Sequence, residues 1–229
     1  VVTSAMSVLL SRVDSLMLGV IATTADVGVY GVVYPLAELL TAGLASFGFL
    51  FTPILSELHA DQELKEMRRI YQVVTKWIFM ITLPVFMVLA VFPEVSISAS
   101  FGSEYAAGSL ALTVLSFGFF SHAVLGPNVN ALTSIGRTRT IMYDNIVVTV
   151  INIILNVVLI PQYSFVGAAV ATTVSYVLLN VLYTIQLYRM TGIHPFTSAL
   201  VRPAVIAFIS MTTIAWVTST YLTSSVPVL

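Results

Sequence analysis

The sequence predicts an all-α fold, a polytopic membrane helix bundle of about seven transmembrane helices. Of its 229 residues, 58% are hydrophobic and 8% are charged, whereas a soluble domain carries about 25% charged residues. Apolar segments follow one another with short connections, and each is long enough to cross a hydrocarbon core of about 30 Å, which takes about 20 helical residues. The net charge of −1 supplies no basic surface for nucleic acid, so no nucleic-acid partner is expected.

Searches for catalytic and metal motifs find none. The chain has no cysteine, which excludes disulfides, thiolate metal ligands and cysteine nucleophiles. His59, His122 and His194 lie far apart without an HExxH pattern, so no metal site is expected. There is no phosphate-binding loop and no dinucleotide glycine pattern, and we therefore expect no cofactor and no enzyme activity. Because the chain begins at Val1 in apolar sequence, we interpret it as a fragment of a longer protein.

We expect membrane spans at residues 2–22, 28–56, 70–92, 105–126, 140–160, 165–188 and 200–222. Residues 1–190 would form a lobe of six helices, and residues 191–229 a cytoplasmic connection with an additional, truncated transmembrane helix. Eight of the nine basic residues flank the second, fourth and sixth connections: Lys65, Arg68, Arg69, Lys76, Arg137, Arg139, Arg189 and Arg202. Since cytoplasmic loops carry the excess of Lys and Arg, the N-terminus is predicted to be cytoplasmic.

The first span carries two ionisable residues. Asp14 lies on one face with Ser4, Ser7 and Ser11, and Arg12 points away from it by about 160° around the helix. Ionised groups inside a membrane are costly unless they face a cavity or a partner, so Arg12 and Asp14 are candidates for a substrate pathway or for ion coupling. A structural ion pair to another helix, with Glu38 as a partner, is the alternative.

Glu38 lies near the middle of the second span, one turn after Pro35. A proline lacks an amide donor and weakens the helix ladder, so Pro35 is a hinge candidate, as is Pro84 in the third span. A carboxylate beside such a kink suits a proton- or cation-coupled carrier, but it also suits a clamp between packed helices.

The fourth span would be too long for one crossing if it ran without a break from residue 105 to 135. Gly126 and Pro127 supply a break and are hinge candidates, with His122 and Asn128 beside them. Broken helices are tolerated where protein or a water-filled cavity satisfies the freed backbone groups. The alternative is an ordinary helix end followed by a re-entrant turn.

Polar residues recur along one face of the fifth span: Asn145, Thr149, Asn152 and Asn156. This polar stripe predicts either substrate contact or hydrogen bonding between helices. Asp144, near the cytoplasmic end, is either an interfacial acid or part of a proton relay.

The fifth span, which carries this stripe, and the sixth span are expected to form a tight hairpin. Pro161 is expected to end the fifth span, because proline disfavours helix in the residue before it. Small residues at four-residue spacing then begin the sixth span and predict close backbone packing: Gly167, Ala171 and Ser175.

Several blocks together resemble the polysaccharide flippase family, a branch of the multidrug/oligosaccharidyl-lipid/polysaccharide exporter superfamily. They are DSLMLGV with DVGVYGVVYPL, FTPILSELHA, FGSEYAAGSLALTVLSFG, NALTSIGRTR and NIILNVVLIPQYSFVGAAVATTVSY, in order over residues 10–185. The resemblance implies two six-helix halves around a central cavity, of which this chain would be the second half plus one helix. It also implies that Arg12, Asp14 and Glu38 face that cavity.

The resemblance further implies a carrier that flips lipid-linked oligosaccharide or polysaccharide across the cytoplasmic membrane by alternating access. Its partners would be that substrate and the membrane lipids. Two alternatives remain at this stage. One is a cation-coupled multidrug exporter of the same superfamily. The other is a non-transporting membrane scaffold whose partners are glycan-assembly enzymes.

Overall fold

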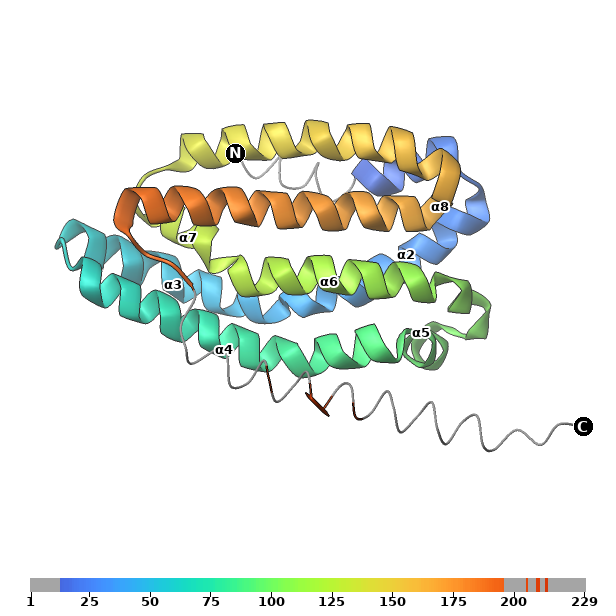
Figure 1. Ribbon diagram of the computed structural model, residues 1–229, viewed down its shortest axis with the longest axis horizontal. Helices are drawn as coiled ribbons and strands as arrows, with labels where there is room; N and C mark the ends of the chain where they lie inside the picture. Colours follow the sequence, from blue (N-terminus) through green and yellow to red (C-terminus); the bar gives the residue numbers. More distant parts are fainter. Residues whose placement is uncertain (1–12, 196–204, 206–208, 211–212, 214–229) are drawn as a thin grey trace, which may run out of the picture. The chain divides into compact units, whose positions relative to one another are not determined.

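The computed structural model describes residues 13–195, 205, 209–210 and 213 (Figure 1). The chain divides into two units, residues 1–195 and residues 196–229. In the first unit, the described residues form helices and connecting turns, which confirms the all-α class. The description below concerns this unit.

The helices of this unit follow one another along the chain with short connections. A helical segment over residues 13–21 comes first. The others are α2 (Thr24–Glu38), the 3-10 turn η1 (Leu39–Thr41), α3 (Ala42–Ala60), α4 (Leu64–Val91), α5 (Pro93–Phe101), the 3-10 helix η2 (Ser103–Gly108), α6 (Ser109–Leu125), α7 (Pro127–Ser134) and α8 (Thr138–Thr191).

Four helical stretches of the described part are long and apolar enough to cross a membrane: Thr24–Ala60, Leu64–Val91, Ser103–Ser134 and Thr138–Thr191. The last is 54 residues long, and non-helical backbone at Ser164 divides it into two arms, residues 138–163 and 165–191. Five of the seven expected spans are thus described. The first is described from residue 13 onward, and the span at 200–222 lies largely outside the described residues.

The hairpin between the two arms differs from the sequence prediction. Pro161 does not end the helix, which continues through it and breaks at Ser164, where φ is 48° and ψ is −130°. A proline in a helix costs one backbone hydrogen bond and crowds the preceding turn, but it keeps a helical φ. Here the chain reverses three residues after the proline, and the prediction of a stop at Pro161 was wrong.

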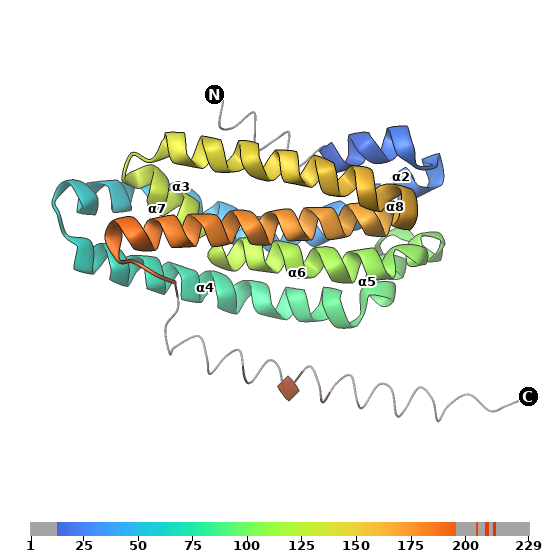
Figure 2. The ribbon, with the colours of Figure 1, turned by 45° about the horizontal axis from the view of Figure 1, so that its top comes forward.

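Helix α6 lies at the centre of the packing. It contacts α8, α4 and α2, and the first arm of α8, the second arm, α6 and α4 lie side by side in both ribbon views (Figures 1 and 2). Leu112, Leu115 and Phe119 of α6 are fully or almost fully buried. Burial of such side chains within the unit is expected where a helix is covered on several sides, so α6 positions the helices around it.

Glycines allow close approach at two places, between α6 and the second arm of α8 and between the two arms of α8. A Cβ atom added at Gly118 of α6 would lie 2.8 Å from Cα of Thr173, and one added at Gly167 would lie 2.4 Å from the carbonyl oxygen of Leu159. The Thr173 hydroxyl also donates to the Val114 carbonyl, at 2.9 Å. These approaches confirm close backbone packing at Gly167, as the small-residue spacing predicted.

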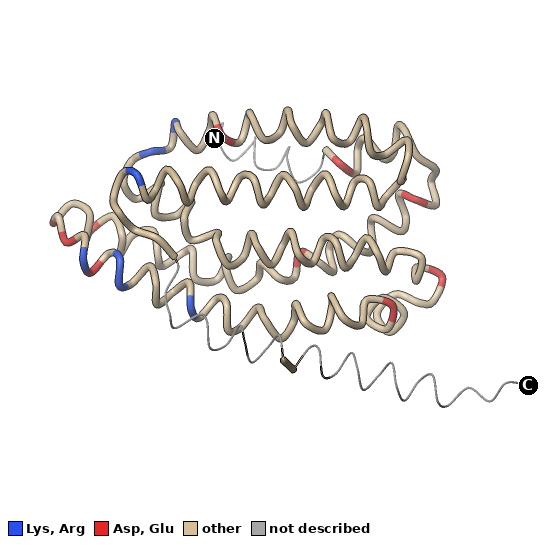
Figure 3. The backbone as a smooth tube through the Cα atoms, viewed as in Figure 1, with Lys and Arg blue, Asp and Glu red and all other residues tan. Residues whose placement is uncertain are grey.

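Basic residues of the described part gather at one end of the helices (Figure 3). This end contains the turn from α3 to α4, the start of α8 and the end of α8. It thus carries the described basic residues of the second, fourth and sixth connections together, as expected if these connections lie on one side of a membrane. Arg202 lies outside the described residues.

Candidate functional site

The most deeply buried charged side chain of the described part is Asp14, in the helical segment 13–21. Its exposed fraction is 0%. Three other elements supply its neighbours, namely α2 and the two arms of α8. A single carboxylate therefore joins helical segments that are far apart in the sequence.

Hydrogen-bonding groups surround both carboxylate oxygens of Asp14. Asn156 Nδ2 donates to Oδ1 at 2.5 Å, and the Tyr30 hydroxyl donates to Oδ2 at 3.4 Å. The Thr172 hydroxyl also donates to Oδ2 and lies 3.1 Å from the Tyr30 hydroxyl. Asn152 Oδ1 accepts a further hydrogen bond from Asn156 Nδ2, at 3.0 Å. We call these five residues the Asp14 cluster.

The Asp14 cluster contains no positive side chain, and none of the ion pairs of the described residues involves Asp14. A buried carboxylate is costly unless a counter-charge, a proton or several donors compensate it. Here neutral donors compensate it. Asn152 Nδ2 and Asn156 Oδ1 meanwhile have no hydrogen-bond partner in the described structure although both atoms are buried.

The two unpartnered amide atoms give the Asp14 cluster a second arrangement. If both amides rotated by half a turn, Asn152 Nδ2 would donate to Asn156 Oδ1, and Asn156 would turn an oxygen toward Asp14. The cluster would then present carboxylate, amide and hydroxyl oxygens, which are the ligands of hard cations. The residues present therefore fit either an ionised Asp14 held by donors or an Asp14 that holds a small cation.

All four residues of the polar stripe are buried, with exposed fractions of 9% or less. Asn145 Nδ2 donates to the Tyr183 hydroxyl of the second arm at 2.7 Å, and the Thr149 hydroxyl bonds to the Asn145 carbonyl. Asn152 and Asn156 belong to the Asp14 cluster. One end of the stripe thus bonds to a neighbouring helix, and the other end reaches the buried carboxylate.

The fourth span breaks at the expected place, between α6 and α7, with Gly126 at the junction. Asn128 Nδ2 donates to the Asn180 carbonyl and to the Thr184 hydroxyl, both at 3.1 Å. His122 Nδ1 accepts from Asn180 Nδ2 at 3.0 Å. Side chains of the second arm therefore fill the surroundings of the break, and the structure brings His122 and Asn128 together with Asn180.

Glu38 and Pro35 lie on the exposed side of α2. The hydroxyl of Tyr34, one turn before Glu38 on α2, lies 3.5 Å from the hydroxyl of Tyr176. The helix continues through Pro35 and changes to the 3-10 turn η1 directly after Glu38. The irregular backbone is therefore one turn beyond the proline.

The remaining sequence candidates are dispersed. Pro84 lies on the exposed side of α4, which runs through it without a break. Asp144 accepts a hydrogen bond from Gln186 at 3.0 Å near the basic end of α8. Arg12 lies outside the described residues, so its pairing with Glu38 stays a hypothesis.

Sequence reasoning missed several partners of these candidates. Tyr30 and Thr172 contact Asp14, Asn180 contacts His122, and Tyr183 contacts Asn145. A signal existed in the second arm, where Thr172, Tyr176, Asn180 and Tyr183 recur at four- and three-residue spacing and form a second polar stripe. Facing stripes on two consecutive helices indicate a shared polar interface.

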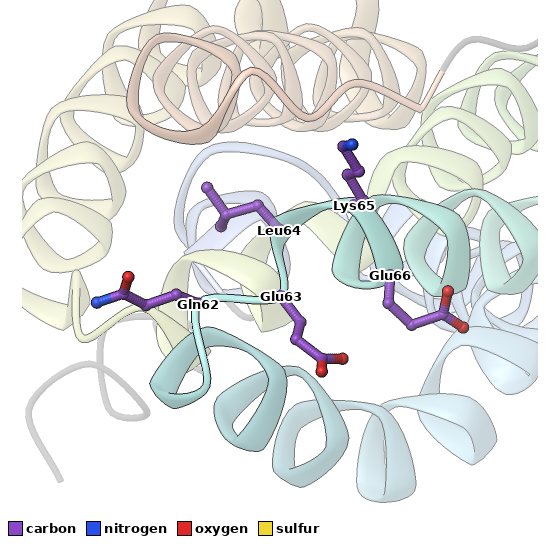
Figure 4. A pocket seen from close by; sticks show the side chains of 5 residues that line it. All are labelled: Gln62, Glu63, Leu64, Lys65 and Glu66. Carbon is purple, nitrogen blue, oxygen red and sulfur yellow. The ribbon is translucent and has the colours of Figure 1, made fainter.

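A surface pocket lies over the turn between α3 and α4 (Figure 4). Its lining residues are Gln62, Glu63, Leu64, Lys65 and Glu66. In the close view, Lys65 points away from the side chains of Glu63 and Glu66. The pocket contains both signs of charge on exposed side chains, and its residues are not convergent on one point.

Long apolar helices packed around a buried carboxylate define a multi-pass membrane helix bundle. The MatE family model matches residues 1–158 of this sequence, more than half of the chain. The chain belongs to the MatE family. This confirms the superfamily that the sequence blocks resemble.

Two curated relatives match the chain. It is 25% identical over 186 residues to the "Probable low-salt glycan biosynthesis flippase Agl15" of Haloferax volcanii, a match that covers 80% of this chain and 39% of that protein. It is 28% identical over 145 residues to the "Uncharacterized membrane protein MJ1068" of Methanocaldococcus jannaschii, covering 63% of this chain and 29% of that protein. The chain thus spans well under half the length of either relative.

Proposed function

We propose that this chain is part of a flippase that moves a lipid-linked oligosaccharide across the cytoplasmic membrane by alternating access, and that the Asp14 cluster couples the movement to a cation. The observation that carries the proposal is a fully buried carboxylate that joins four helical segments in a chain of the MatE family. Similarity to a protein named a probable glycan flippase supports the substrate class.

Coupling would follow from the two arrangements of the Asp14 cluster. With donors turned inward, the charge of Asp14 is compensated by hydrogen bonds from Asn156 and Thr172. With oxygens turned inward, the same residues bind a cation instead. Because these residues come from different helices, exchange between the two arrangements changes the contacts between the helices, and differential binding of this kind shifts a conformational equilibrium.

Glu38 supports a substrate pathway along α2. It is exposed in the middle of the apolar stretch 24–60 and makes no side-chain hydrogen bond within the described structure. Because acidic residues at membrane depth face an interior or a water-filled cavity rather than lipid, this side of α2 would line the cavity. A polar cavity would shield the oligosaccharide while the lipid chains stay in the bilayer.

The first experiment measures which leaflet holds the lipid-linked oligosaccharide in cells that lack the gene. We expect accumulation on the cytoplasmic leaflet and loss of surface glycan. The intact gene would restore both, whereas Asp14→Asn would not. Glu94→Gln is the matched control, because Glu94 is exposed at the start of α5. Normal sidedness in the deletion strain would contradict flipping.

The same strain distinguishes the other functions. A cation-coupled multidrug exporter predicts increased drug susceptibility with normal glycan sidedness; the Asp14 cluster fits this alternative as well. A membrane scaffold predicts that the purified protein moves no lipid in vesicles, while glycan-assembly enzymes co-purify with it. The flippase predicts movement by the purified protein alone.

A further inference from the structure

Asp144 and Gln186 face each other across the two arms of α8, near its basic end. Gln186 Nε2 donates to Asp144 Oδ1 at 3.0 Å. The amide cannot be reversed without cost, because reversal would place the Gln186 carbonyl oxygen against the carboxylate. The hydrogen bond therefore determines which oxygen of each side chain is left to form a further hydrogen bond.

The remaining atoms of this pair are Asp144 Oδ2 and Gln186 Oε1. Both are buried, and neither has a hydrogen-bond partner in the described structure. Both are acceptors when Asp144 is ionised, so neither can satisfy the other. Leaving two buried acceptors unsatisfied is costly, because each has lost its hydrogen bonds to water without gaining another. This cost requires an explanation, because buried polar atoms are normally paired.

Charged groups on the neighbouring helices do not explain why these two atoms lack a partner. Of the helices packed against α8, the described residues of α7 contain no ionisable side chain, α6 contains His122, which bonds to Asn180, and α2 contains Asp26 and Glu38. None of these forms an ion pair or a hydrogen bond with Asp144 in the described structure. On α8 itself, Tyr183 and Arg189 lie three residues before and after Gln186, and Arg139 lies five residues before Asp144. No ion pair or hydrogen bond joins any of them to Asp144 in the described structure.

We propose that Asp144 and Gln186 form a proton-binding site. A proton on Asp144 Oδ2 would convert that atom into a donor to Gln186 Oε1, while Gln186 Nε2 continues to donate to Asp144 Oδ1. The two groups then form a planar carboxylic acid–amide pair with two parallel hydrogen bonds. One proton thus satisfies both unpartnered atoms, whereas the ionised pair satisfies neither.

The site lies at the end of a line of polar contacts between the two arms. Asn145, next to Asp144, donates to Tyr183, and Thr149 bonds to the Asn145 carbonyl one turn further along. The stripe then continues to Asn152 and Asn156 of the Asp14 cluster. If the proposed transport takes place, the Asp144–Gln186 pair is where a proton enters or leaves at the basic end, an assignment that rests on the proposed function.

Infrared difference spectroscopy of the intact protein in membranes tests the site without measuring transport. As the pH is lowered, we expect the carbonyl band of a protonated carboxylic acid to appear, to shift in D2O and to be lost in Asp144→Asn. Asp14→Asn must leave this band in place. Gln186→Leu removes the amide partner, so the band should move to higher frequency, as expected for a carbonyl that loses a hydrogen bond.

Asp144→Asn also provides a positive test. Its amide group can donate from the position of Oδ2 to Gln186 Oε1, so the variant reproduces the protonated pair and should fold with at least the thermal stability of the unmodified protein. Gln186→Leu should be less stable than Asp144→Asn, because it leaves both carboxylate oxygens without a donor.

Two results would overturn the proposal. One is the absence of an Asp144-dependent band at every pH at which the protein stays folded. The other is a carboxylic acid band whose frequency does not change in Gln186→Leu, which would show that protonated Asp144 is not hydrogen-bonded to Gln186. A band with both expected responses in a protein that flips no lipid would retain the proton site and reject the proposed function instead.

Discussion

At the scale of single residues, the stability of Asp14 depends on the donors that surround its carboxylate. Asn156 and the Thr172 hydroxyl both point at its carboxylate, in a place where water does not reach the side chain. Removing the carboxylate would therefore take away the acceptor that the two donors share and leave Asn156 only the Asn152 side chain, and Thr172 the Ala168 carbonyl, whereas an amide of the same shape would keep an acceptor atom in place.

We expect Asp14→Ala to lower the free energy of unfolding by about 2–4 kcal/mol, because it removes the hydrogen bonds of Asn156 and Thr172 to the buried carboxylate and creates a small cavity. Asp14→Asn should be destabilised much less. Thermal unfolding of the purified protein in detergent measures both, with Glu94→Gln as a variant that should match the unmodified protein. Equal unfolding temperatures for Asp14→Ala and Asp14→Asn would show that the donors are not held by Asp14.

The sequence predicted which residues carry polar chemistry better than it predicted their partners. Spacing of four, three and four residues was enough to place Asn145, Thr149, Asn152 and Asn156 on one buried face. The partners of Asp14 are 16 to 158 residues away along the chain. Helical periodicity contains no information on contacts at such separations, since they depend on how the helices pack.

At the scale of the elements, the hairpin between the two arms of α8 was predicted wrongly from its proline and correctly from its small residues. Pro161 was expected to end the helix, but the helix continues for three more residues to the break at Ser164. Gly167 was expected to allow close packing, and it lies against the backbone of Leu159 and Ile160. A proline biases the chain locally, but the place of the turn is fixed by this close approach.

Gly167→Ala is predicted to destabilise the protein by about 1–3 kcal/mol, because the added Cβ would overlap backbone atoms that cannot move independently. Its Cβ would lie 2.4 Å from the Leu159 carbonyl oxygen. Gly31→Ala is the matched control: it is also helical, has nothing within 4 Å of the added atom, and should gain up to about 1 kcal/mol from helix propensity. Thermal unfolding that ranks the two in the opposite order would contradict the close approach.

Ser164→Gly is predicted to stabilise the hairpin by roughly 1 kcal/mol, since a positive φ is strained for residues with a Cβ and not for glycine. Ser164 has φ 48° at the break. Gln162→Gly, two residues earlier in regular helix on an exposed side, should instead lose about 1 kcal/mol. A higher unfolding temperature for Ser164→Gly together with a lower one for Gln162→Gly would establish the break at Ser164. Equal decreases in unfolding temperature for the two variants would argue for a continuous helix.

At the scale of the whole first unit, the distribution of charge relates the fold to the membrane. Three connections that the sequence marks as basic meet at one end (Figure 3). The other end carries acidic residues without Lys or Arg among the described positions, including Asp26, Glu94 and Glu104. This arrangement agrees with the sequence-based prediction that the basic end is cytoplasmic, a prediction that a measurement of sidedness would decide.

The absence of cysteine from the chain makes that measurement simple. We predict that Lys65→Cys, at the start of α4, reacts with a membrane-impermeant thiol reagent only after the cells are opened. Glu104→Cys, in η2 at the opposite end, should react in intact cells. Both residues are exposed, so access to the side chain does not differ between them. Any difference in labelling therefore reports the side of the membrane.

Reaction of the two variants in the reverse order would invert the orientation, and the Asp144–Gln186 pair would then exchange protons with the outside. Labelling of both in intact cells would show that the two ends lie on the same side, which a helix such as α4 cannot satisfy if it crosses the membrane between them. The same pair of variants thus tests the orientation and the span of α4 together. Because the basic end includes both termini of α8, the result also places the proton site on one defined side of the membrane.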